Sequence, residues 1–167
     1  MYEARKISNF LIARSHTHSF ELTNLRLNKL LYFIHGWALT SRREGLIRNH
    51  FVAWEHGPVI RPVYDAFKTY GDAKITEPAR YLDYISGKNK VVPYDDIPPA
   101  DTETIMRVFS NYDRYSTGKL VEMSHERGGP WDVIFTAWSK DHKRNLRIPN
   151  DLIRSHFLQQ AGGKVRH

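Results

Sequence analysis

The run Ser124-His125-Glu126 combines the residue types of a nucleophile, a base and an acid that could orient the base. Adjacent side chains diverge along a helix, however, and the sequence contains no nucleophile-elbow motif. His125 falls at the end of a short predicted helix, where a histidine can bond the terminal carbonyls or favour the negative end of the helix dipole. The pattern therefore favours a structural role for His125 over catalysis, and a hydrolase that uses His125 or His56 stays the alternative.

Metal chemistry is the second type of reaction that the residue types suggest, since the chain has nine histidines. His16-Thr17-His18 has a spacing that suits a loop or strand, but no third ligand or carboxylate is close in sequence. The chain has no cysteine, which excludes disulfides, Cys-ligated zinc, iron–sulfur clusters and thiol catalysis. We therefore predict exposed loop histidines, no metal site and no cofactor.

The segment Trp54–Val59 contains a glycine and a proline in succession, Gly57-Pro58, which predicts a sharp turn between a strand and a helix. One interpretation is a rigid corner of the fold. The other is an edge presented to a partner, with Trp54 and His56 as contacts. A single glycine without a following Lys-Ser/Thr is no phosphate-binding loop.

The charge balance favours acidic partners. Lys and Arg number 25 against 18 Asp and Glu, a formal net charge of +7. A basic cluster comprises Lys140, Lys143, Arg144 and Arg147. We interpret it as solvated surface, with contacts to an acidic partner or to nucleic acid as the alternative.

The elements that position these residues are mostly helical. The length of 167 residues fits one compact domain, and apolar residues recur at helical spacing around residues 7–14, 27–38, 63–70, 105–112, 120–123, 131–138 and 153–158. Thr23-Asn24, Ser116 and Asn150 can cap helices, and Pro62 and Pro130 suit first turns. We predict a mainly α (α+β) single domain of six to seven helices with a small antiparallel sheet. Its core spans about 6–158, and residues 159–167 form a flexible tail.

Three short segments predict the β part. Phe51–Trp54 is apolar and bounded by turn residues, and Tyr81–Ile85 and Val91–Tyr94 flank a turn-rich stretch over 86–90. We expect a hairpin there that pairs with Phe51–Trp54, because a lone hairpin is marginal in water. The stripe of Trp131, Ile134, Phe135 and Trp138 is predicted to be core.

No apolar run approaches the ~20 residues of a membrane helix, and the first residues turn polar within one helical turn. These features predict a cytoplasmic protein without a signal peptide.

Four ordered motifs resemble the Panacea domain family of SocA-like antitoxins and GepA-like phage-associated proteins. Leu25–Trp37 is similar to its KLLY…GW helix, Phe51–Val59 to its AW…GPV segment, and Val63–Gly71 to its vy..fk.yG helix. Leu120, Ser124, His125 and Gly129–Trp131 resemble its L..lsH…PW segment, so the resemblance covers about residues 6–158. The motif residues that form the shared scaffold or partner surface are Lys29, Tyr32, Trp37, Trp54, His56, Gly57, Pro58, Val59, Tyr64, Tyr70, Gly71, Ser124, His125, Pro130 and Trp131.

The resemblance implies a non-enzymatic antitoxin that binds and neutralises a cognate protein toxin, encoded next to it. It also implies a variant of this role, in which an adaptor delivers the toxin to a Clp-type protease. A masking interface of this type would bury ~1,600 Å² with aromatic and Arg anchors. The alternative is a DNA-binding regulator or a phage-associated regulatory protein, but the helix over 23–39 is too apolar for a DNA groove.

The chain departs from the family pattern at Asn28, where Gln is frequent, and in a longer loop at Glu126–Gly129. The hairpin region Tyr81–Tyr94 matches no motif of the family. Partner choice depends on such variable surfaces, so these departures bear on the partner and not on the fold.

Overall fold

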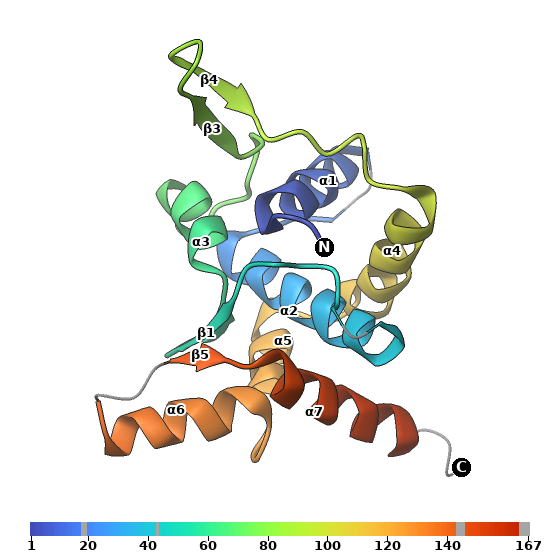
Figure 1. The fold of residues 1–167 in the computed structure, drawn as a ribbon, viewed down its shortest axis with the longest axis vertical. Helices are drawn as coiled ribbons and strands as arrows, with labels where there is room; N and C mark the ends of the chain where they lie inside the picture. Colours follow the sequence, from blue (N-terminus) through green and yellow to red (C-terminus); the bar gives the residue numbers. More distant parts are fainter. Residues whose placement is uncertain (18–19, 43, 143–145, 164–167) are drawn as a thin grey trace.

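The computed structural model describes residues 1–17, 20–42, 44–142 and 146–163. This part of the chain has seven α-helices and two small antiparallel sheets (Figure 1), so the prediction of a mainly α fold is confirmed. The helices are α1 (Ala4–Thr17), α2 (Asn24–Ser41), α3 (Arg61–Phe67), α4 (Pro99–Asp113), α5 (Thr117–Ser124), α6 (Pro130–Lys140) and α7 (Asn150–Gly163), and the 3-10 turn η1 (Lys68–Tyr70) follows α3.

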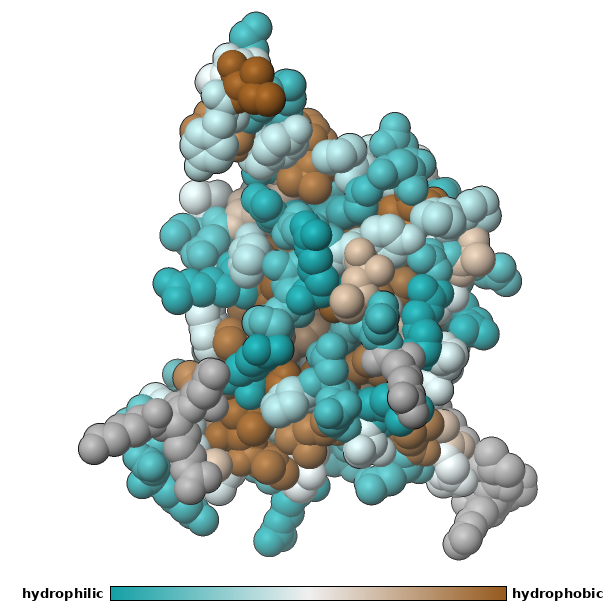
Figure 2. Space-filling model, in the orientation of Figure 1, coloured by the Kyte–Doolittle hydropathy of each residue, from teal (hydrophilic) through white to brown (hydrophobic). Residues whose placement is uncertain are grey.

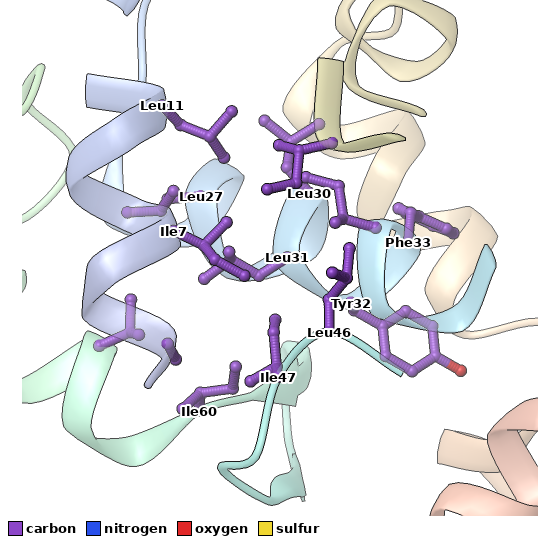
Figure 3. Packing of buried hydrophobic residues seen from close by; sticks show 14 of the residues in the cluster. Ile7, Leu11, Leu27, Leu30, Leu31, Tyr32, Phe33, Leu46, Ile47 and Ile60 are labelled. Carbon is purple, nitrogen blue, oxygen red and sulfur yellow. The ribbon is translucent and has the colours of Figure 1, made fainter. Parts of the chain in front are cut away.

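Helix α2 is the centre of the fold. Thr23 caps it as predicted, since the Thr23 hydroxyl accepts the Arg26 N–H at 3.2 Å. The buried surface of α2 is wider than the predicted apolar stripe, because 14 of its 18 residues are buried, Tyr32, Phe33 and several polar residues among them. Figure 3 shows α1 side chains packed against this helix. On another side of α2, a Cβ at Gly36 would overlap the Phe157 ring, so the glycine lets α7 approach closely.

The predicted helix starts are confirmed except at α7. Ser116 accepts the Lys119 N–H at 3.2 Å, and α3 and α6 carry a proline in their first turn. Asn150 was expected to cap α7, but it is already a helical residue, and its side-chain oxygen lies 3.2 Å from His35 instead. Leu158 was expected on the apolar side of α7 and is 38% exposed.

The first sheet has the order β2-β1-β5, with β1 (Phe51–Trp54) at its centre between β2 (Gly57–Val59) and β5 (Arg147–Ile148). Trp54 pairs with Gly57, so residues 55–56 form the turn. The prediction of a turn at Gly57-Pro58 is therefore wrong by two residues. Pro58 is tolerated within β2 because this strand lies at the edge of the sheet.

The second sheet is a separate hairpin of β3 (Arg80–Asp83) and β4 (Lys88–Val91). The hairpin itself was predicted, but its expected pairing with β1 is wrong, because β2 and β5 occupy both edges of β1. Its loop also lies at 84–87 and not at 86–90. The hairpin stands away from the body of the domain (Figure 1).

Helix α7 continues to Gly163, into the residues predicted as a tail, and 164–167 lie outside the described residues. Within the described ranges no helix combines the length and apolarity that a bilayer crossing requires.

Candidate partner-binding groove

A groove of about 740 Å³ opens between β1, α3 and α6. Four aromatic side chains dominate its walls: Trp54 and Tyr64 on the β1–α3 side, and Phe135 and Trp138 on the α6 side. The other lining residues are Asn24, Leu25, Asn28, Ala53, Glu55, His56, Val59, Lys68, Gly71, Asp72 and Leu146. The groove therefore combines broad apolar surface with a few charged groups.

The α6 wall continues as a row of stacked rings. The Trp131 ring stacks on His125 at 3.8 Å and on Phe135 at 4.7 Å, and Phe135 contacts Trp138 at 5.8 Å between ring centres. The sequence predicted this stripe as core, but Pro130 is the only buried residue of α6. Helix α6 packs mainly on β1, β5 and α7, and Trp131, Ile134 and Phe135 reach the core only in part. Phe135 and Trp138 stay half exposed in the groove.

A hydrogen bond connects the α6 wall of the groove to the β1 wall. The Trp131 indole N–H donates to the Trp54 carbonyl oxygen at 2.7 Å, which joins α6 to β1. Trp54 then meets Tyr64 edge to face, with ring centres 4.9 Å apart, which joins β1 to α3. Trp131 thus positions the groove, while Trp54 and Tyr64 line it.

Lys29 is fully buried beneath β2, and its ammonium donates to the Pro58 carbonyl at 2.9 Å. Burial lowers the pKa of Lys29 to about 7, because the charged form loses its hydration. The contact holds the edge strand against α2. The motif residue Lys29 therefore acts below the surface and does not reach the groove.

Gly57 lies between the buried side chains of Lys29 and Ser124, and the three residues form a buried cluster at β2. The φ of Gly57 is +98°, a left-handed value that favours glycine. A Cβ there would lie 2.8 Å from both Lys29 Cε and Ser124 Oγ. Backbone conformation and lack of space both require glycine at this position.

Ser124 and His125 point to different partners. The Ser124 hydroxyl donates to the Val121 carbonyl at 2.8 Å, whereas the His125 ring stacks on Trp131. Burial and the nearby Lys29 charge lower the pKa of His125, so its ring is neutral at pH 7. The expected bonds from the His125 ring to terminal carbonyls are wrong: its backbone N–H makes these bonds, to Val121 and Glu122.

Two asparagines that the sequence analysis did not select as site residues fix the α3 wall. Asn28 accepts the Ile60 N–H at 2.9 Å, and Asn24 donates to the Tyr64 carbonyl at 3.0 Å. Both amides lie on one side of α2, four residues apart. Two amides four residues apart on one side of a mainly apolar helix are the signal that could have identified them.

His35 performs a similar anchoring role elsewhere on α2. Its Nδ1 accepts the Ile47 N–H at 3.1 Å, and its Nε2 lies 3.2 Å from Asn150 Oδ1. Burial lowers the pKa of His35 to about 4, so the neutral ring joins α2 to the following loop and to α7.

The remaining predicted site residues lie apart from the groove or at its margin. His56, Val59 and Gly71 line it, and Pro130 starts the α6 wall. Away from it, the Trp37 indole donates to the Tyr112 hydroxyl at 2.7 Å, the Tyr70 hydroxyl accepts the Glu77 N–H at 3.1 Å, and Tyr32 is buried with no hydrogen-bond partner for its hydroxyl among the described residues.

Part of the predicted basic cluster and of the histidine pair falls outside the described residues, namely Lys143, Arg144 and His18. Lys140 and Arg147 are exposed near the end of α6 and on β5. Among the described side chains, no three His, Cys, Asp or Glu residues lie together so that they could hold a metal ion.

Fold and site together define a mainly helical domain that displays an aromatic groove above a buried polar scaffold. This chain belongs to the antitoxin SocA-like Panacea domain family, whose model matches residues 27–132. It is 36% identical over 161 residues to the antitoxin SocA of Caulobacter vibrioides (strain NA1000 / CB15N), a match that spans 95% of this chain and 84% of the relative. No solved structure gives a significant match.

The family supports an antitoxin role and suggests a non-catalytic one. The family match ends at Asp132, within α6, so it contains the β1–α3 wall of the groove but not Phe135 or Trp138.

Proposed function

We propose that this chain neutralises a cognate protein toxin by binding it directly in the aromatic groove. The observation that carries the proposal is the placement of Trp54, Tyr64, Phe135 and Trp138 around one surface hollow of about 740 Å³. Aromatic side chains that are exposed in a concave surface supply much of the binding energy of protein interfaces. Membership in an antitoxin family supplies the class of partner.

The scaffold below the groove supports this assignment. The Trp131 bond to Trp54 and the asparagine bonds to α3 hold both walls in place before a partner arrives. A preformed site loses little conformational freedom on binding, which strengthens the affinity that a given contact area provides. The buried groups therefore serve the groove by keeping its shape.

The test is co-expression with the product of the adjacent gene, followed by growth rescue and co-purification. Trp138→Ala should weaken the complex by at least tenfold, because it removes one of the two aromatic side chains of the α6 wall. Val133→Ala is the matched control, since Val133 is 44% exposed on the same helix and does not line the groove. Equal binding by the two variants would refute the groove as the binding site.

The same cells distinguish masking from delivery to a Clp-type protease. Direct inhibition predicts that the toxin accumulates in an inactive complex. An adaptor role predicts that the toxin level falls when the antitoxin is present and recovers when the protease is removed. We propose masking as the primary activity, because the groove supplies a binding surface that requires no third protein.

A further inference from the structure

The tip of the β3–β4 hairpin exposes the two most accessible large hydrophobic side chains of the described chain. Ile85 is 99% exposed and Tyr84 is 89% exposed, and Leu82 and Tyr81 beside them are 45% and 39% exposed. Figure 2 shows the hydrophobic surface at the end of the projecting hairpin. Isoleucine is among the residues most often buried in proteins, and here it lies in a group of four exposed apolar side chains on one projecting element, which makes the tip a candidate interaction site.

Hydrogen bonds and an ion pair within the turn define the conformation of the tip. Asp83 organises it: its carboxylate accepts the Ser86 hydroxyl at 2.6 Å and the Ile85 N–H at 3.3 Å, and forms an ion pair with Lys90 at 2.5 Å. The Gly87 N–H closes the turn on the Asp83 carbonyl at 2.8 Å, and Gly87 takes a φ of +65°. These bonds fix the loop that presents Tyr84 and Ile85 to the outside.

The base of the hairpin is held with equal specificity by Asn9 of α1, a completely buried side chain. Its amide donates to the carbonyls of Ala79 (3.0 Å) and Val92 (2.9 Å), and its oxygen accepts the Ala79 N–H at 2.6 Å. The Val92 N–H also donates to the Ala79 carbonyl at 3.0 Å, which closes the two chains just before the hairpin begins. The β3–β4 hairpin, called the arm below, therefore projects from a base that buried hydrogen bonds hold, and it exposes apolar side chains at its tip.

The charges around the tip indicate what type of surface it meets. Arg80, Lys88 and Lys90 lie on the hairpin against one acidic residue, Asp83, which is paired with Lys90. The arm thus carries a net charge of +2 on a chain whose net charge is +7. A positively charged arm complements an apolar pocket with an acidic rim and is repelled by a pocket with a basic rim.

We propose that the β3–β4 hairpin is a second anchor for the toxin, inserting Tyr84 and Ile85 into an apolar pocket with an acidic rim on the toxin surface. This inference rests on the proposed function. Gly71 and Asp72 line the groove, and β3 starts only eight residues after Asp72, at Arg80. Figure 1 places α3 between β1 and the hairpin, so a partner that occupies the groove and extends past α3 would meet the arm. The arm would then select among toxins that the groove alone accepts.

The experiment measures the Kd of the full-length chain for the purified product of the adjacent gene. Ile85→Ser should weaken binding by at least tenfold and the Tyr84→Ser/Ile85→Ser double variant by about a hundredfold, as expected for buried interface anchors. Lys88→Glu should slow association and reduce its dependence on salt, because it replaces a positive charge of the arm, which attracts the acidic rim of the toxin, with a negative one. The tip touches no core residue, so the Tm of each variant should stay within about 2 °C of the unmodified chain.

Leu158→Ser is the matched control, since it removes an exposed leucine of α7 far along the chain from the hairpin and should leave Kd within about twofold. A tip variant that binds the toxin normally, while Trp138→Ala does not, overturns the second anchor and leaves the groove intact. A tip variant that loses affinity only for anionic vesicles or for duplex DNA also overturns it, in favour of a lipid or nucleic-acid contact. Failure of the unmodified chain to bind this toxin refutes the proposed function, and the second anchor with it.

Discussion

Gly57→Ala tests the buried cluster that supports the groove. The substitution places a Cβ on a residue with φ +98°, which costs about 1–2 kcal/mol for an L residue in the left-handed region. The new methyl group also lies 2.8 Å from Lys29 Cε and Ser124 Oγ, and overpacking of this type costs about 1–3 kcal/mol. We expect a total loss of about 2–5 kcal/mol, or a fall in Tm of roughly 5–15 °C.

Gly71→Ala separates the two costs. Gly71 also has a positive φ, +54°, but a Cβ there would meet no atom within 4 Å. It should lose only about 1–2 kcal/mol, the conformational part. Thermal and urea unfolding followed by circular dichroism measure both variants on the same scale.

A second substitution identifies which neighbour is crowded. Ser124→Ala removes the Oγ contact, so the Gly57→Ala/Ser124→Ala double variant should recover part of the loss beyond the sum of the single effects. The Lys29 contact stays, so recovery should be incomplete. Equal losses for Gly57→Ala and Gly71→Ala would refute the argument, because they would show that Lys29 and Ser124 exert no crowding.

Three further predictions concern buried polar groups. The pKa of Lys29 is lowered to about 7 in the folded chain, so between pH 7 and 10 the unfolded chain binds more protons at this lysine than the folded chain does. The free energy of unfolding should therefore rise by about 2–3 kcal/mol from pH 7 to pH 9 relative to that of Lys29→Met. Parallel pH profiles of the two proteins would contradict this. The pKa of His35 is lowered to about 4, so the stability that the neutral ring contributes is complete above pH 6.5 and is lost as the pH falls from 6.5 to 4. Urea titrations should show that the free energy of unfolding falls by up to about 3 kcal/mol over this range, a fall that His35→Gln lacks. Tyr32→Phe removes a buried hydroxyl without a partner in the described chain and should raise Tm by about 2–4 °C, whereas a lower Tm would reveal a bond that the hydroxyl makes.

Two helices with the same apolar spacing show what the sequence could and could not predict. Ile105, Val108, Phe109 and Tyr112 of α4 are all buried, as expected. The matching stripe of α6 is half exposed, because β1, β5 and α7, its main neighbours, cover it only in part. Periodicity indicates that one side of a helix is apolar, but not whether other elements of the fold cover that side completely.

The errors in the β part have a similar cause. Phe51–Trp54 was predicted correctly, yet its partners were not, because β5 is only two residues long and lies more than 90 positions away. So short a strand has no detectable pattern of its own. Gly57 and Pro58 were predicted as a turn from their residue types, but both belong to β2. Pro58 fits there because β2 is an edge strand, and Gly57 supplies the positive φ with which the strand begins.

The four tryptophans divide into two pairs, which gives the protein an internal optical reporter. Trp37 and Trp131 donate hydrogen bonds to groups of the domain itself, while Trp54 and Trp138 line the groove. A toxin seated there would remove water from the second pair and shift their fluorescence emission to shorter wavelength. A complex formed away from all four tryptophans would leave the emission unchanged, and Trp37→Phe would remove the signal of a partner bound at the separate hollow that Trp37 lines. In that variant the emission wavelength reports whether the partner occupies the groove, without any added label.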